Sequence, residues 1–214
     1  MNLAELKSAH ERKKGAIRKR LAEFGRIRKG GSGTAGSEFY ELCYCILTAN
    51  GSAAAGRKAQ ACLEKSGFWK TGIIGDCLKN VRYNGNKKKF ILQNRKNILE
   101  DGLDLRGFLS GGAFSLRERI AKDGRRFKGL GWKASSQFLR NTGFRGLAIL
   151  DRHILKNLKE LRVIKQFPKT LTKKKYLEIE RKMKNFCERI GIPIDEFDLL
   201  LWTEESGAKM EEAK

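Results

Sequence analysis

The chain has 214 residues, enough for one large or two small domains with a buried core. Its 46 lysines and arginines outnumber its 24 aspartates and glutamates, so the formal net charge is +22. This charge favours a polyanion, and we expect nucleic acid rather than a membrane surface, because the sequence shows neither an apolar span nor a membrane anchor. A basic surface with no specific partner is the alternative.

The chain contains five cysteines, which are Cys43, Cys45, Cys62, Cys77 and Cys187. Their spacing matches neither a zinc site nor a four-cysteine iron–sulfur loop, so we expect no metal ion and no cofactor. Cys43 falls in an apolar helical stripe and is predicted to lie in the core. Because the sequence shows no signal peptide, we expect an intracellular, reducing location.

Helical periodicity dominates the first half of the sequence, and strand signals are nearly absent. Residues 3–28 are predicted to form a basic amphipathic helix or two short ones, before glycines at 30–33 interrupt the chain. Ser37 is predicted to cap the next helix. Further helices are expected over residues 52–65, 73–78 and 86–99. The lysines at 87–89 are interpreted as a solvated face or a phosphate contact.

In the second half of the sequence, the patterns predict a pair of helices followed by three further helices. Ser115 begins a capping-box pattern, which predicts a helix from residue 116 to about 126. A second helix is expected from near Trp132 to Gly143. Asp151 and Thr172 are predicted to cap the helices that follow them, and a last helix is expected over residues 197–202.

Gly129 and Gly131 flank one apolar residue between two helical segments, a pattern typical of a helix-hairpin-helix turn. Both glycines can adopt a positive φ, which lets the backbone approach a ligand closely. The helix that starts near Trp132 would direct unpaired N–H groups outward. We therefore predict a site for a DNA phosphate at this turn, next to Lys128.

Lys133 lies in the first turn of a helix, where the helix dipole disfavours a cation. The positive end of a helix favours the neutral amine, and a neutral amine is the nucleophile that covalent chemistry at a sugar carbon requires. Asp151 follows eighteen residues later and is expected to stay ionised at its helix N-terminus. The pair predicts a catalytic lysine and carboxylate, although from spacing alone Asp151 is equally well explained as an N-cap.

Around Gly129, Gly131, Lys133 and Asp151 the sequence resembles the helix-hairpin-helix DNA glycosylase superfamily. The resemblance extends over residues 39–50, 82–95, 138–141, 150–155, 168–180 and 198–202. In this combination the chain looks like the second, mainly archaeal, family of 8-oxoguanine DNA glycosylase/lyases, over roughly residues 37–207. The resemblance implies a bifunctional enzyme that flips a damaged purine out of double-stranded DNA, forms a Schiff base through Lys133 and breaks the strand by β-elimination.

The resemblance also implies contacts to DNA outside the hairpin. Arg82 and Tyr83 would meet the base opposite the lesion and fill the vacated stack, and Tyr83 stands where the family has phenylalanine. Asn50 would lie near the lesion. The alternatives are a surface arginine beside a half-buried tyrosine, and an Asn50 that only caps the next helix.

Trp202 could stack on an extruded base or simply pack the last helix. The resembled family ends in a lysine nine residues past this tryptophan, and that lysine helps to recognise 8-oxoguanine. Here Glu211 occupies that position and the chain ends at Lys214, which would reach the pocket through a longer tail. His153 is interpreted as a packing residue rather than a general base.

We therefore expect an all-α protein of two helical domains. Residues 37–145 would form a middle bundle that ends in the hairpin, and residues 1–36 plus 146–214 would form the second domain. Lys133 and Asp151 would face each other across the cleft between the domains. We expect a monomer that binds no membrane. The alternative functions are a nonenzymatic helix-hairpin-helix DNA-binding protein, and a glycosylase for another damaged base.

Overall fold

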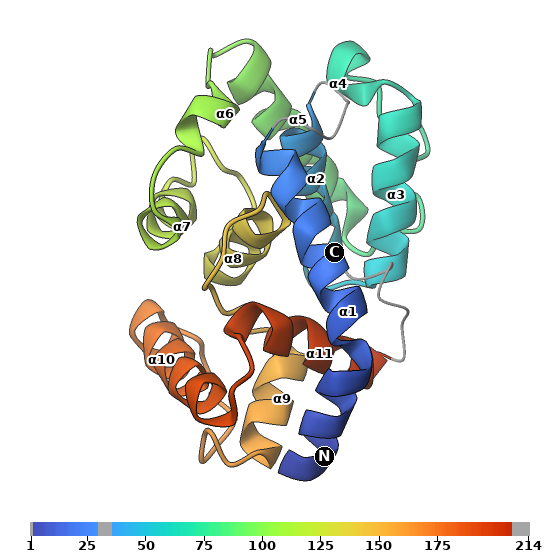
Figure 1. The fold of residues 1–214 in the computed structure, drawn as a ribbon. Helices are drawn as coiled ribbons and strands as arrows, with labels where there is room; N and C mark the ends of the chain where they lie inside the picture. Colours follow the sequence, from blue (N-terminus) through green and yellow to red (C-terminus); the bar gives the residue numbers. More distant parts are fainter. Residues whose placement is uncertain (1, 30–35, 207–214) are drawn as a thin grey trace.

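The computed structural model describes residues 2–29 and 36–206. All regular secondary structure in these two ranges is helical, which confirms the predicted all-α fold (Figure 1). The helices are α1 (Leu3–Arg28), α2 (Ser37–Thr48), α3 (Ala53–Lys65), α4 (Phe68–Thr71), α5 (Asn84–Leu99), α6 (Leu105–Phe108), α7 (Ala113–Lys122), α8 (Trp132–Asn141), α9 (Arg152–Glu160), α10 (Lys173–Ile190) and α11 (Ile194–Ser206). No helix in the described part is both long and apolar enough to cross a membrane.

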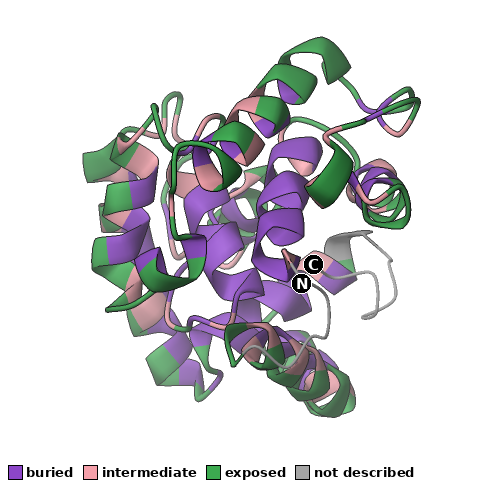
Figure 2. Cartoon of the chain, turned by 90° about the horizontal axis from the view of Figure 1, so that it is seen from above, coloured by how far each residue is buried: buried purple, intermediate pink, exposed green. Residues whose placement is uncertain are grey.

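Buried apolar side chains gather into two clusters. The first runs from Phe39 to Leu147 and is built by α2 to α8. The second joins the inner face of α1 to residues between Ala148 and Leu201, most of which belong to α9, α10 and α11. These clusters correspond to the two groups of helices in Figure 1, and Figure 2 shows buried residues at the centre with exposed faces outward. The chain passes from one cluster to the other just before Asp151.

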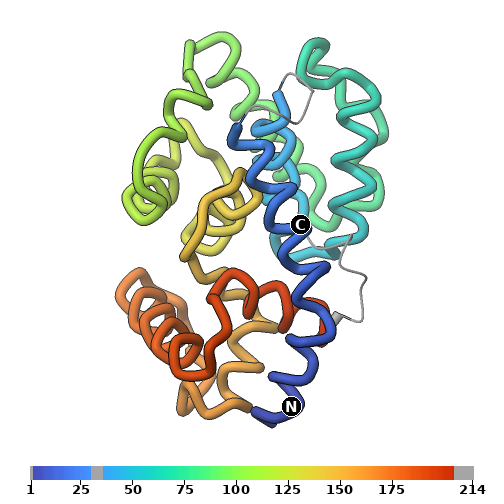
Figure 3. Tube along the Cα trace, in the orientation of Figure 1, coloured from blue at the N-terminus to red at the C-terminus, as the bar shows by residue number. Residues whose placement is uncertain are grey.

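The basic N-terminal segment forms one continuous helix, so the first of the two predicted forms is correct. Asn2 accepts a hydrogen bond from the Glu5 backbone and the Glu5 side chain accepts one from Asn2, which fixes the start of α1. Leu6, Ile17 and Phe24 are buried on its inner face. α1 contacts both α11 and α8, and it extends alongside both groups of helices (Figure 3).

Several predicted helix starts are correct and three local predictions are wrong. Asp151 and Thr172 cap their helices through their side chains, as predicted. The helix expected over residues 52–65 is also present, and Ser52 caps it. Ser37 does not cap α2, because the cap position is held by Gly36. Ser115 lies inside α7, where its hydroxyl donates to the Gly112 carbonyl at 2.9 Å. Residues 73–78 form no helix: the turns begin at residue 75, and a short helix, α4, ends before this segment.

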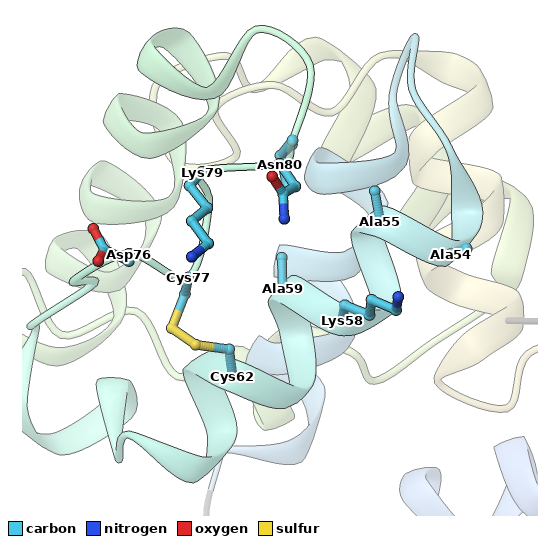
Figure 4. A pocket seen from close by; sticks show the side chains of 10 residues that line it. Ala54, Ala55, Lys58, Ala59, Cys62, Asp76, Cys77, Lys79 and Asn80 are labelled. Carbon is cyan, nitrogen blue, oxygen red and sulfur yellow. A yellow bond between two sulfur atoms is a disulfide. The ribbon is translucent and has the colours of Figure 1, made fainter.

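Two of the cysteines form a disulfide that was not predicted from the sequence. Cys62 of α3 is bonded to Cys77 in the turns that lead to α5 (Figure 4). Cys43 is fully buried, as predicted. The disulfide fastens a segment that has little regular structure of its own and that continues directly to Arg82 and Tyr83.

Candidate active site

The hairpin consists of α7, a turn and α8. Gly129 has a φ of +82°, and a Cβ there would lie 2.8 Å from Cδ2 of Phe90, so this position needs glycine for both conformation and space. Gly131 is different: its φ is −83° with an extended ψ, and a Cβ would meet nothing within 4 Å. The predicted positive φ is therefore correct for Gly129 and wrong for Gly131.

Helix α5 holds the hairpin turn in place. The Asn94 amide is fully buried, accepts a hydrogen bond from the Lys128 backbone N–H and donates one to the Lys128 carbonyl, each 2.9 Å long. Asn97 donates to the carbonyls of Arg125 and Arg126 at 2.9 and 3.0 Å. The turn is thus fixed by side chains about thirty residues away, and no local sequence pattern predicts these contacts.

Lys133 is the second residue of α8 and is half-buried. Its Nζ donates a hydrogen bond of 2.6 Å to Oε1 of Gln137, one turn further along the helix. A neutral acceptor orients the amine without pairing it with a charge. Lys133 therefore presents an oriented amine at the start of the second hairpin helix.

Asp151 is half-buried at the N-cap of α9, where its Oδ1 accepts a hydrogen bond of 2.9 Å from the Ile154 backbone N–H. The cap uses a single carboxylate oxygen. Asp151 therefore does cap a helix, as the alternative interpretation predicted. It is compatible with a chemical role for the same carboxylate.

Lys133 and Asp151 line one cavity of about 230 Å³. Its walls come from α2, the following loop, the start of α3, the segment before α9, and the helices α8, α9 and α11. The other lining residues are Tyr44, Thr48, Gly51, Ser52, Ala53, Gln137, Arg140, Ile149, His153, Ile154, Asp198 and Trp202. Both hydrophobic clusters thus contribute to the cavity.

A buried ion pair lies against this cavity. Nη1 of Arg140 is 2.5 Å from Oδ2 of Asp198, and both side chains are almost completely buried. Burial raises the pKa of Asp198 to about 7, although the Arg140 guanidinium acts in the opposite direction. Asp198 Oδ1 has no hydrogen-bond partner within the described residues. Both residues fall within the resembling ranges 138–141 and 198–202, but no role was predicted for either of them.

Trp202 and His153 also line the cavity. Trp202 is partly exposed and packs at the same time against the second hydrophobic cluster, so its two proposed roles are not exclusive. His153 is exposed at the start of α9. Lys214, the predicted base-recognition residue at the C-terminus, lies outside the described residues.

Three further predicted DNA contacts lie outside the set of cavity-lining residues. Asn50 is exposed, has a φ of +51° and immediately precedes Gly51, which lines the cavity. Because α3 is capped by Ser52, the alternative role of Asn50 as that cap is excluded. Arg82 and Tyr83 are exposed, and the guanidinium lies 4.8 Å from the centre of the tyrosine ring.

Lys87 was predicted to be solvated or to contact a phosphate, and this prediction is wrong. Its side chain is buried, and its Nζ donates a hydrogen bond of 2.7 Å to the Leu47 carbonyl at the end of α2. Burial lowers the pKa of this amine. Lys87 therefore braces the loop that carries Asn50, whereas Lys88 and Lys89 are exposed.

A second cavity of about 330 Å³ lies between α3 and residues 76–81. Figure 4 shows the Cys62–Cys77 disulfide at its edge, with Lys58, Lys79 and small alanine side chains around it. Its ionisable side chains are the two lysines and Asp76, all of them exposed. This cavity lacks the buried polar groups of the site at Lys133 and Asp151.

Comparison with known proteins gives concordant results. The sequence profile of the family described as 8-oxoguanine DNA glycosylase matches residues 17–192. An 8-oxoguanine DNA glycosylase/AP lyase of Fusobacterium nucleatum is 39% identical over 210 residues, which cover 95% of this chain and 94% of the relative. The crystal structure of the 8-oxoguanine DNA glycosylase of Thermotoga maritima superposes with a TM-score of 0.83 at 37% identity, covering 96% of both chains.

A third relative was crystallised with DNA. The Methanocaldococcus jannaschii 8-oxoguanine glycosylase/lyase, in complex with a 15mer DNA containing 8-oxoguanine, has a TM-score of 0.76 and 32% identity to this chain. The superposition covers 96% of this chain and 98% of that one. The similarity therefore spans both hydrophobic clusters and the cavity to which they contribute.

Proposed function

The chain belongs to the 8-oxoguanine DNA glycosylase family, and from this premise we propose that it excises 8-oxoguanine from double-stranded DNA and cleaves the strand at the resulting abasic site. The observation that carries the proposal is that Lys133 and Asp151, eighteen residues apart in sequence, line one cavity. The net charge of +22 supports a DNA partner. The enzyme acts as a monomer inside the cell, with residues 37–145 as one domain and residues 1–36 plus 146–214 as the other.

Lys133 is the nucleophile in this proposal. Its neutral amine attacks C1′ of the damaged nucleotide, a bond forms between Nζ and C1′, and the bond from C1′ to the base breaks with its electron pair leaving on the base. The amine loses a proton and the departing base takes one up. Opening of the sugar ring then gives a Schiff base, which makes the C2′ proton acidic and lets the 3′ phosphate leave by β-elimination.

Asp151 stabilises the charge that develops on the sugar. As the base departs, C1′ acquires oxocarbenium character, and a fixed carboxylate at a helix N-terminus lowers the energy of that positive charge. The same carboxylate takes part in the proton transfer from Lys133. Trp202 supplies an aromatic surface for the flipped purine, and Lys214 extends the recognition of that base.

DNA is held by the elements around the cavity. The backbone at Gly129 and Gly131, with Lys128 beside it, binds a phosphate. Tyr83 enters the gap that the flipped base leaves, and Arg82 contacts the opposite base. Asn50 approaches the lesion from the loop that Lys87 braces.

Borohydride trapping on a duplex that contains 8-oxoguanine tests the proposal. The wild-type protein should give a covalent protein–DNA adduct and a cleaved strand, and Lys133→Gln should bind the duplex but give neither. Lys182→Gln removes the same charge from an exposed position on α10 and should leave adduct formation unchanged. A wild-type protein that releases base without forming an adduct would exclude Lys133 as the nucleophile. A protein that binds DNA without releasing any base would be a nonenzymatic binder.

A further inference from the structure

Two side chains one turn apart on the inner face of α10, Tyr176 and Glu180, contact both halves of the candidate site. Both are buried, with 0% and 4% of their surface exposed. Neither lines the cavity. Their polar atoms are nevertheless bonded to the segment that carries Asp151 and to the hairpin that carries Lys133.

The contacts toward Asp151 are made with the backbone. The Tyr176 hydroxyl donates to the Ala148 carbonyl at 2.7 Å and accepts from the Leu150 N–H at 3.3 Å. Oε1 of Glu180 accepts from the Ala148 N–H at 2.9 Å. Residues 148–150 lie outside any helix and directly precede Asp151, so α10 fixes the point from which that carboxylate enters the cavity.

The contacts toward Lys133 are made with side chains of both hairpin helices. Glu180 forms a two-pronged ion pair with Arg117 of α7, with N–O distances of 2.5 and 2.8 Å. The Tyr176 hydroxyl lies 3.1 Å from Oγ of Ser136 in α8. Its ring centre lies 5.8 Å from that of Trp132, the residue next to Lys133.

We propose that Tyr176 and Glu180 are positioning residues, which set the separation between the Lys133 amine and the Asp151 carboxylate. The inference rests on the proposed function, because it concerns the two groups assigned there to the chemistry. Buried hydrogen bonds and a two-pronged ion pair hold fixed geometry better than apolar contacts do. A displacement of about 1 Å between reacting groups can slow a reaction by about a hundredfold.

Tyr176→Phe is the sharpest test, because it deletes one hydroxyl and keeps the ring that packs on Trp132. We expect base release from an 8-oxoguanine duplex under single-turnover conditions to slow by about 10- to 100-fold, with duplex affinity unchanged. Borohydride trapping at a preformed abasic site should slow less. That reaction needs the lysine, but no base departs, so the carboxylate has less developing charge to stabilise.

Tyr40→Phe is the matched control. Tyr40 is also buried, and its hydroxyl also bonds to backbone groups, accepting from the Trp69 N–H at 3.1 Å, but its partners belong to α3 and α4 and not to the hairpin or the segment before Asp151. Both variants should lose similar thermal stability, and only Tyr176→Phe should lose base release. If the two variants release base at the same rate, the positioning role is wrong. If the wild-type protein itself releases no base, the proposed function has failed instead.

A second variant covers the case in which Tyr176→Phe does not fold. The double substitution Arg117→Met with Glu180→Gln removes the ion pair without leaving a lone buried charge, and the glutamine oxygen can still accept from Ala148. Circular dichroism should show an intact fold, and base release should fall at least about tenfold at unchanged duplex affinity. Wild-type rates in this folded variant would overturn the proposal.

Discussion

Nζ of Lys133 donates a hydrogen bond of 2.6 Å to Oε1 of Gln137, one turn further along α8. Both residues line the cavity, so the bond determines where the amine lies before DNA arrives. The acceptor is an uncharged amide. The amine can therefore leave this bond to attack without separating from an opposite charge.

The first prediction concerns the charge at Gln137. Gln137→Glu places a carboxylate next to the Lys133 amine. The negative charge favours the protonated amine and so lowers the fraction of neutral amine that can attack. We expect adduct formation at pH 7 to slow by about tenfold or more, which corresponds to a stabilisation of the charged amine by about 1.4 kcal/mol. Gln166→Glu changes the net charge equally at an exposed position and should keep the wild-type rate. An unchanged rate for Gln137→Glu would show that this bond does not matter.

The second prediction separates the two roles of Asp151. Asparagine caps helices as well as aspartate does, so Asp151→Asn should preserve α9 and change the melting temperature little. The negative charge is lost, and we expect base release to fall by at least about a hundredfold. Asp104→Asn makes the same change at the N-cap of α6, away from the cavity, and should remain fully active. If Asp151→Asn is also active, the carboxylate is only a cap.

The sequence predicted the helix starts that depend on local chemistry. Asp151 and Thr172 each bond to a backbone N–H three residues later, so side chain and target are set by spacing alone. The prediction that Ser37 caps α2 is wrong because of a contact with a residue distant in sequence. Gly36 packs so closely on the indole of Trp69 that a Cβ would lie 2.9 Å from Cδ2, and the chain turns there instead.

The sequence predicted the reactive residues of the candidate site but not the side chains that hold them in place. Lys133 and Asp151 stand out through residue type, glycine spacing and helix position. The pairing of Arg140 with Asp198 spans 58 residues, and that of Asn94 with Lys128 spans 34. No local pattern specifies such partners, because they depend on how the helices pack. For the same reason Lys87, one of three adjacent lysines, gave no sign that it is buried.

The third prediction uses the backbone of Tyr83, which has a φ of +57° and a half-exposed ring. A left-handed conformation is unfavourable for tyrosine and free for glycine, so Tyr83→Gly should raise the free energy of unfolding by up to about 1 kcal/mol. The same change removes the ring that we propose fills the DNA stack. Base release from an 8-oxoguanine duplex should therefore fall although the protein becomes more stable.

Arg162→Gly is the control for this prediction. Arg162 has a φ of +58° in the turn after α9, away from the cavity-lining residues. Urea denaturation should show a gain in stability for both variants, and only Tyr83→Gly should lose activity. Equal activity of the two variants would remove Tyr83 from the proposed DNA interface.

The fourth prediction concerns the disulfide between Cys62 and Cys77, which are separated by 15 residues. A disulfide that closes a loop of this length stabilises a protein by about 3 kcal/mol, mainly because it lowers the conformational entropy of the unfolded chain. Replacing both cysteines by alanine should therefore lower the free energy of unfolding by about that amount. A reductant should destabilise the wild-type protein and leave the double variant unchanged. Equal sensitivity of both proteins would show that the bond does not contribute.

The fifth prediction concerns Asp198, whose pKa burial raises from 3.8 to about 7. The folded protein therefore binds more protons at this carboxyl than the unfolded chain does between about pH 4 and pH 7. The contribution of Asp198 to stability is accordingly highest at the acidic end and falls as the pH rises through this interval. Above pH 7 the full cost of the buried charge is present.

Asp198→Asn removes this titration and leaves the other ionisable groups in place. The stability of the wild-type protein relative to the variant should therefore decrease between pH 4 and pH 7, by at most about 4 kcal/mol. Urea denaturation of both proteins at half-unit pH steps gives this difference directly. The unpaired Arg140 of the variant adds a constant offset, because its guanidinium stays charged at every pH in this interval and its effect on Asp198 is already part of the raised pKa. A difference that rises with pH would show that Arg140 outweighs burial and keeps Asp198 ionised.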